Sequence, residues 1–312
     1  MRYRRGADLV FTARLGRTSV PSTAPSDSLV RALDGAIAGR QGALFDLLAR
    51  GSHLPGTRMN VALAEAFALA CRARGAQADA VALALARLSA NEAPGATALE
   101  FLPVCGLCAL GARAATDESV RARFVAELHG HADDLRFRSR EAVVQALSRI
   151  GQAAGESLVR DVAPWMDGYF HAAAVVLALA LDPWLGSLHD SDTVVARFDE
   201  AFALLQAAPR AAARWPGHKE LLLALERATP SVALRFGASV FDMVERWSVV
   251  SDPTLREAIE RVIGAKKLVG RHASDVDRVR RALDASRPAV RNPDHDVGPT
   301  RDRSRNRRRG GR

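Results

Sequence analysis

The sequence predicts an all-α protein, and three observations support this. Hydrophobic residues make up 48% of the 312 residues while aromatic residues make up only 5%, with Ala and Leu abundant. That balance favours close helix-on-helix packing over β-sheets. From Ser26 onward, apolar residues recur at helical spacing with short breaks. Residues 134–151 combine a turn aspartate, an apolar stripe and a closing glycine, and the stripe needs neighbouring helices to cover it. We therefore expect an α-solenoid of stacked antiparallel helix pairs.

Helices are predicted along most of the chain from the spacing of apolar residues. The predicted ranges are 29–49, 58–74, 77–89, 97–114, 118–131, 134–151, 155–163, 171–181, 219–228 and 274–285. Three further helices are predicted from their start signals, Ser191–Asp192, Thr229–Pro230 and Asp252–Pro253. An aspartate or threonine caps the free backbone N–H groups at such a start, and proline at the first helical position has no N–H to lose.

A repeated arrangement of charged residues occurs at the turns between predicted helices. Asp134 precedes Arg140, Asp252 precedes Arg256, and Asp167 precedes His171 where a basic residue is expected. In stacked repeats such an aspartate accepts hydrogen bonds from the next helix N-terminus and from an arginine of the neighbouring unit. We therefore interpret these carboxylates as structural. Residues 183–250 lack the arrangement, so we expect degenerate repeats or an insertion there.

Over roughly residues 100–270, the chain resembles HEAT-repeat proteins of a bacterial group with no assigned role. The residues that carry the resemblance are 134–151, Phe101-Leu-Pro-Val-Cys-Gly, Glu245-Arg-Trp, Asp252-Pro and Arg256. The resemblance implies stacked helix pairs and no active site, because the repeated Asp and Arg are structural in that family. His171 departs from the family's usual basic residue.

The net charge of +9 lies at the two ends of the chain. Residues 287–312 hold nine arginines against three aspartates, and residues 1–20 hold five arginines against one aspartate, which leaves 21–286 at −1. We expect three regions: a disordered basic leader (1–25), the HEAT-like α-solenoid (26–286) and a disordered Arg-rich tail (287–312). The tail is expected to attract polyanions, so nucleic acid is an alternative partner.

Cysteine content and hydropathy predict a cytoplasmic protein that does not contact membranes. Three cysteines in 312 residues cannot form a disulfide framework, and no apolar signal segment opens the sequence. The apolar run Ala172–Leu181 is far shorter than the roughly 20 residues that a membrane span needs.

Two short motifs invite a redox or metal hypothesis. Cys105-Gly-Leu-Cys108 has the spacing of a redox motif, but no strand precedes it and its neighbours are small. A redox thiol of this kind needs a helix N-terminus to lower its pKa, so we interpret both as core cysteines. His129-Gly-His131 could donate to a metal, but the sequence shows no third ligand at helical spacing. We expect these histidines to end a helix and expect no cofactor.

An enzymatic alternative comes from HEAT-like DNA glycosylases, which repair alkylated bases. Such enzymes hold the base against aromatic side chains beside an acid, and Trp165, Asp167 and Trp184 would be that constellation. Arg138 or Arg140 would then contact phosphate. A duplex-binding groove needs a cationic lining, and residues 21–286 are nearly neutral, so we do not favour an enzyme.

The preferred hypothesis is a non-catalytic scaffold that binds a protein partner on the concave face made by successive second helices, with no small-molecule substrate. Partner contacts are expected from Arg138, Arg140 and Arg256. Polyanion contacts are expected from the tail arginines Arg301, Arg303, Arg305, Arg307, Arg308, Arg309 and Arg312.

Overall fold

A computed structural model describes residues 24–287, so the leader up to residue 23 and the tail from residue 288 lie outside the described residues. Within that range the protein is all-helical, with 77% of residues in helices and no strand. The predicted all-α class is therefore confirmed.

The described residues form sixteen α-helices and three short 3₁₀ helices, joined by turns and loops. In chain order they are α1 (Asp27–Ile37), α2 (Gly42–Gly51), α3 (Val61–Arg74), α4 (Ala76–Ala86), η1 (Ala98–Glu100), α5 (Phe101–Thr116), α6 (Glu118–His129), α7 (Phe137–Ala154), α8 (Glu156–Asp161), η2 (Ala163–Asp167), α9 (Tyr169–Leu179), α10 (Asp182–Leu185), α11 (Ser191–Gln206), η3 (Arg210–Arg214), α12 (Pro216–Phe236), α13 (Ala238–Ser248), α14 (Pro253–Ile263), α15 (Lys266–Arg271) and α16 (Ala273–Ala285).

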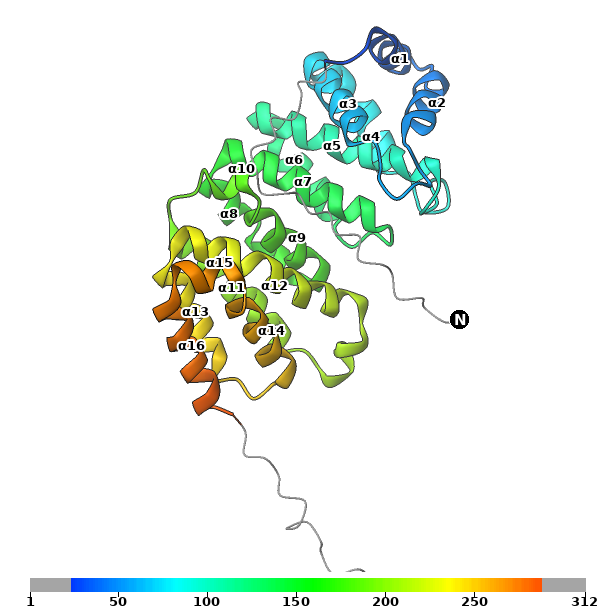
Figure 1. Ribbon diagram of the computed structural model, residues 1–312. Helices are drawn as coiled ribbons and strands as arrows, with labels where there is room; N and C mark the ends of the chain where they lie inside the picture. The colour runs from blue at the N-terminus through cyan, green and yellow to red at the C-terminus, as the bar shows by residue number, and fades with distance from the viewer. Residues whose placement is uncertain (1–23, 288–312) are drawn as a thin grey trace, which may run out of the picture.

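The longer helices follow one another along the molecule (Figure 1). In one row α3, α5, α7, α9, α12 and α14 each pack against the next. A second set, α4, α6, α8, α11, α13 and α16, packs against this row, and the short helices α10 and α15 stand in sequence before α11 and α16. Below, the two sets are called the first and the second helices. Contacts therefore run mainly between neighbours in sequence.

Helix α5 is the most enclosed helix, with 13 of its 16 residues buried among α3, α4, α6 and α7. Together with η1 it forms a stretch, Ala98–Thr116, that is long and apolar enough to cross a membrane, and 78% of its most apolar window is buried. Glycines allow the close approach: a Cβ on Gly106 would lie 2.3 Å from the backbone N of Ala86, and one on Gly111 would lie 2.7 Å from Ala146 Cα.

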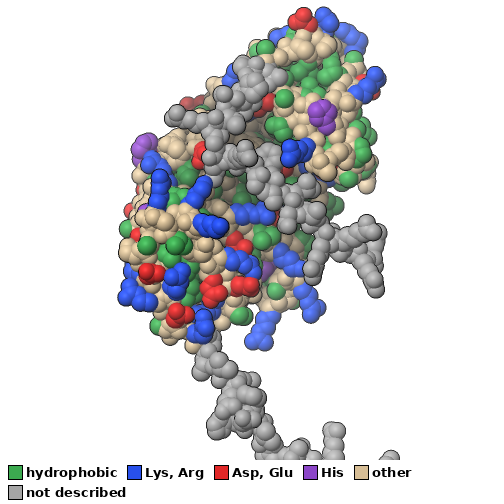
Figure 2. All heavy atoms as spheres, in the orientation of Figure 1, with side chains coloured by type: hydrophobic (Ala, Val, Ile, Leu, Met, Phe, Trp, Pro, Cys, Tyr) green, Lys and Arg blue, Asp and Glu red, His purple; other side chains and the backbone are tan. Residues whose placement is uncertain are grey.

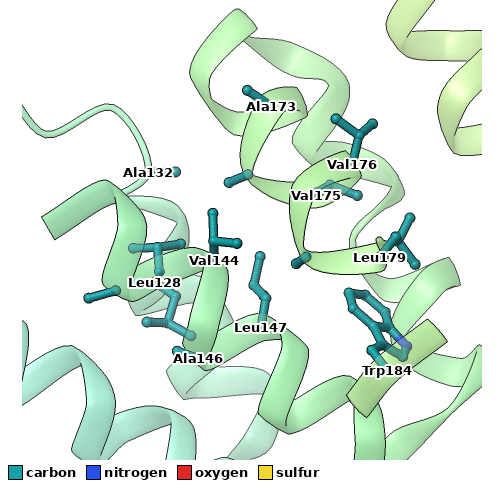
Figure 3. Packing of buried hydrophobic residues seen from close by; sticks show 14 of the residues in the cluster. Leu128, Ala132, Val144, Ala146, Leu147, Ala173, Val175, Val176, Leu179 and Trp184 are labelled. Carbon is teal, nitrogen blue, oxygen red and sulfur yellow. The ribbon is translucent and has the colours of Figure 1, made fainter. Parts of the chain in front are cut away.

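The core continues between α7 and α9. Figure 3 shows Val144 and Leu147 of α7 pointing toward α9, which carries Val175 and Leu179, with the Trp184 ring close to Leu179. Trp184 is fully buried. Its ring takes the space above Gly151, where a Cβ would lie 2.1 Å from the indole. The closing glycine of the 134–151 segment therefore makes room for α10.

Buried arginines connect helices and loops that are distant in sequence. Arg113 of α5 donates from Nε to Asp79 of α4 at 2.8 Å and also pairs with Asp117 at 3.1 Å. Arg136 pairs with Asp134 and donates to the carbonyls of Leu88 and Ala93, in the loop after α4. The hydrogen bonds from Arg136 satisfy backbone carbonyls that would otherwise be buried without partners.

The repeated aspartates are not equivalent. Asp252 caps α14, where its carboxylate accepts from the N–H groups of Thr254 and Leu255. Asp134 accepts from the N–H and the side chain of Arg136 rather than from a neighbouring unit, and these contacts lower its pKa against the raising effect of burial. Asp167 caps no helix and instead meets His129 and His171.

Two helix predictions are wrong. The range 29–49 is two helices, because Gly39 adopts a φ of +86° between α1 and α2. The Thr229–Pro230 start is absent, because Pro230 lies inside the continuous helix α12, where the Thr229 hydroxyl donates to the Leu225 carbonyl. The break occurs instead at Gly237, whose φ is +56°.

We predict that Gly111→Ala destabilises the protein, because the new methyl group meets backbone atoms of α7 and the two helices must separate. Overpacking of this kind costs about 1–3 kcal/mol. The free energy of unfolding, measured with urea, should fall by that amount. Gly42→Ala is the control, since a Cβ there meets nothing within 4 Å. Equal stability of the two variants would contradict the close contact.

Candidate functional site: a groove over the central helix

A groove of about 260 Å³ lies over α5 between α3 and α7. Its floor is formed by Val104 and Cys108 of α5. The remaining lining residues are Met59, Val61, Ala64, Glu65, Glu141, Ala142, Gln145, Ala146, Ser148, Arg149, Gln152 and Pro183. The first helices therefore carry this surface, whereas the sequence-based expectation placed the binding face on the second helices.

Small residues on both walls keep the groove open. Ala64 of α3 and Ala142 and Ala146 of α7 are buried and short, so the walls stand apart over the floor. Val61, at the start of α3, has 46% of its surface exposed at the mouth. An apolar side chain that enters the groove would remove its own surface, and that of Val61, from water.

The charged groups of the groove differ in how they are satisfied. Glu65 of α3 forms an ion pair with Arg149 of α7, so these two charges neutralise each other. Glu141 forms no hydrogen bond or ion pair through its side chain with any residue of 24–287. Burial raises the pKa of Glu141, and the nearby Arg138 lowers it to a smaller extent. The groove thus presents one carboxylate that lacks a cationic partner.

The thiol in the lining of the groove is poorly suited to nucleophilic chemistry. The one thiol in its lining belongs to Cys108, and burial raises the pKa of that thiol to about 11. A thiol at that pKa is almost entirely protonated at neutral pH and is a poor nucleophile.

The three arginines predicted to contact a partner occupy different environments. Arg138 pairs with the buried Glu100 at 2.8 Å. Arg140 donates to the Asp134 carbonyl, and its guanidinium lies over the Phe170 ring at 4.6 Å. Arg256 is buried and donates to carbonyls of Ser248, Val250 and Leu283 and to Ser286. The guanidinium of Arg256 is therefore occupied inside the fold and forms no part of an exposed surface.

The charge of the described residues agrees with a concentration of basic groups at the chain ends. Residues 24–287 sum to zero, because 21–286 carry −1, residues 21–23 are uncharged and Arg287 adds +1. On the face seen in Figure 2, basic and acidic side chains are interspersed over the described helices. The tail arginines predicted to contact polyanions, including Arg301 and Arg312, lie outside the described residues, and that role stays a prediction.

The glycosylase constellation is not assembled. Trp165 and Asp167 precede α9, whereas Trp184 follows it, and a helix of 11 residues separates them by about 16 Å. Trp184 is buried, and its indole N–H donates to the Gly155 carbonyl at 3.3 Å. A buried, hydrogen-bonded ring has no free face on which a flipped base could stack.

Cys105 and Cys108 lie in the middle of α5, as the core-cysteine interpretation predicts. Cys105 is fully buried, and burial raises its thiol pKa well above the ordinary value. The thiols are free. These surroundings oppose the low thiol pKa that redox motifs require.

Sequence reasoning missed Glu65, Glu141 and Arg149. Glu141, Gln145 and Arg149 follow one another at intervals of four, which is the pattern of an ordinary solvated helix face. Nothing in that spacing shows that α3 stands opposite, because Glu65 is 84 residues from Arg149.

No protein-family model matches the chain, and comparisons with curated proteins and with solved structures give no match either. The interpretation of the site therefore rests on the residues of this chain.

The thiols offer a direct check of α5 burial. At about pH 8, Cys108 and the other two cysteines should react with Ellman's reagent roughly 100-fold or more slowly than a free thiol, because burial keeps their thiols protonated. In concentrated guanidinium chloride all three cysteines should react at once. Fast reaction of the fully buried Cys105 in the native protein would show that α5 is not enclosed as described.

The raised pKa of Glu141 predicts how the free energy of unfolding depends on pH. Its folded pKa lies above the ordinary value of 4.5, so the native state keeps this proton to a higher pH than the unfolded state does. In that interval the native state binds more protons, and the free energy of unfolding therefore falls as pH rises.

Glu141→Gln should remove this fall and make the protein more stable near neutral pH. Urea unfolding across a pH series measures the effect, with Glu260→Gln on α14 as the exposed control. If the free energies of unfolding of the wild type and Glu141→Gln change with pH in parallel, the pKa of Glu141 is not raised in the folded protein.

Proposed function

We propose that this protein is a non-catalytic HEAT-like α-solenoid that binds a protein partner in the groove over α5. The observation that carries the proposal is an apolar groove with one unpaired, partly buried carboxylate at its mouth, that of Glu141. A protein partner can supply both an apolar side chain and a cation to such a site.

The packing order supports the solenoid part of the proposal. Each first helix contacts the next one, and buried arginines such as Arg113 and Arg136 join successive pairs. A chain whose units contact mainly their neighbours forms an extended surface rather than one closed core. Residues 183–250 then count as degenerate repeats, because α11 and α13 continue the row of second helices.

The size of the groove supports an anchor side chain over a whole small molecule. Its volume of about 260 Å³ falls below the roughly 300–1,000 Å³ of typical small-molecule sites. Recognition helices and peptides instead place single apolar residues into grooves between helices.

The charges indicate which segment fits. Arg149 is already neutralised by Glu65, so the carboxylate of Glu141 is the charge left for the partner. We propose a segment that places an apolar side chain beside Val61 and an arginine or lysine against Glu141. A charge-assisted hydrogen bond formed there would also lower the raised pKa of Glu141.

A peptide-display selection against the full chain tests this chemistry while the partner is still unidentified. Enriched peptides should combine an apolar residue with arginine or lysine. Glu141→Gln should weaken their binding by about 10-fold or more, because hydrogen bonds to charged groups contribute about 1.5–3 kcal/mol. Val61→Asp should weaken binding as well, while an acidic residue in the first turn keeps α3 intact.

Glu260→Gln is the matched control, and its affinity should equal that of the wild type. Selected peptides that bind all four proteins equally would place the binding surface elsewhere and overturn the proposal.

A further inference from the structure

Three potential metal ligands meet at the junction of α6, η2 and α9. They are His129, the last residue of α6, Asp167, the last residue of η2, and His171 in the first turn of α9. His129 Nε2 lies 3.1 Å from Asp167 Oδ2, and His171 Nδ1 lies 2.9 Å from Asp167 Oδ1. One donor atom from each of the three residues falls within 4.8 Å of the others.

These separations suit a tetrahedral transition-metal ion. Zinc binds imidazole nitrogen and carboxylate oxygen at about 2.0–2.2 Å, and tetrahedral angles then place neighbouring ligand atoms roughly 3.3 Å apart. Asp167 Oδ1 lies 3.3 Å from His129 Nε2 and 2.9 Å from His171 Nδ1, and both separations are close to that value. A metal ion lies in the plane of each imidazole that binds it, so one of the two rings must rotate before all three donors surround one ion.

One donor lacks a hydrogen-bond partner. Nδ1 of His171 is buried and forms no hydrogen bond of acceptable geometry with a described residue, although Asp167 is near. A buried nitrogen without a partner is costly unless another species satisfies it. A metal ion would take the lone pair of this nitrogen.

The surroundings hold the two rings in place. The imidazoles of His129 and His171 are stacked, with centroids 4.0 Å apart and planes at 16°. The buried Trp165 packs edge-on against both rings. This packing brings both nitrogens close to Asp167. Binding of one ion by both imidazoles would turn one ring out of the stack.

The site opens on one side. A cavity of about 640 Å³ is lined by His129, Trp165 and Asp167 together with residues of α6 and α8. Asp167 has 51% of its side chain exposed. Two of the three ligands, His129 and Asp167, line this cavity, so a fourth position on the ion would be open to water, as in catalytic zinc sites rather than in closed structural ones.

We propose that His129, Asp167 and His171 form a binding site for Zn²⁺ or a similar imidazole-preferring divalent ion. Two imidazoles and one carboxylate favour zinc over magnesium or calcium, which prefer all-oxygen ligands. The ligands come from the end of α6, the end of η2 and the first turn of α9, so the ion would join segments of three successive helix pairs. His131, which the sequence pairs with His129, lies instead against Glu127 at 3.4 Å.

Isothermal titration of the untagged full chain with zinc chloride tests the proposal. We expect saturable binding of one zinc ion per chain. Asp167→Asn and His171→Asn should each weaken it by more than about 100-fold, because even the loss of residues that only orient ligands costs 10–100-fold. His189→Asn is the control, since that ring is exposed and lies outside the cluster.

Cobalt substitution gives an independent readout. A tetrahedral Co²⁺ site produces intense visible absorption, and that signal should vanish in His129→Asn while circular dichroism shows an intact fold. Zinc binding that survives all three ligand substitutions would overturn the proposal. An absence of saturable binding to the wild type would overturn it too and would leave the cluster as a hydrogen-bonded group around Asp167.

Discussion

The close packing of α5 against its neighbours is the constraint on which the rest of the structure depends. Gly106 lets α4 approach, and Gly111 lets α7 approach, to distances at which a single methyl group would collide with backbone. Because α5 packs deeply between α3 and α7, its outward side forms the floor of the groove. The groove is thus a direct product of small residues in the core, and its shape follows from the packing that gives the helices their order.

Charged residues inside this protein serve mainly to join helix pairs. Arg113, Arg136 and Arg256 are all buried and donate to carboxylates or backbone carbonyls. Arginine suits this role because its five donors can satisfy several acceptors at once. Glu141 and the His129, Asp167 and His171 cluster stand apart from that pattern. Glu141 forms no ion pair with a described residue, and Nδ1 of His171 is buried without a hydrogen bond, which is why both proposals are built on these groups.

The sequence predicts the class of fold well because helix signals are local. Asp252 followed by Pro253 starts a helix as expected, since the cap and the proline act within one turn. The predicted helix start at Pro230 is wrong for a tertiary reason. Thr229 and Ala233 on either side of Pro230 are buried, and this packing keeps α12 continuous through the proline. The groove and the histidine cluster are beyond local reasoning, because their members come from separate helices. His129 and His171 are each unremarkable in sequence, and only the fold brings the end of α6 and the first turn of α9 close enough for the two rings to stack.

The enclosure of α5 has a consequence for how the chain is made. Helices α3 and α4 leave the ribosome before α5, but α6 and α7 leave after it, and 38 residues separate the end of α5 from the end of α7. At ordinary synthesis rates of about 5–20 residues per second, that interval lasts about 2 to 8 s. Until α6 and then α7 emerge, α5, which has 13 of its 16 residues buried in the folded protein, has only α3 and α4 as partners. A nascent-chain factor that recognises apolar helices therefore meets α5 before α7 does.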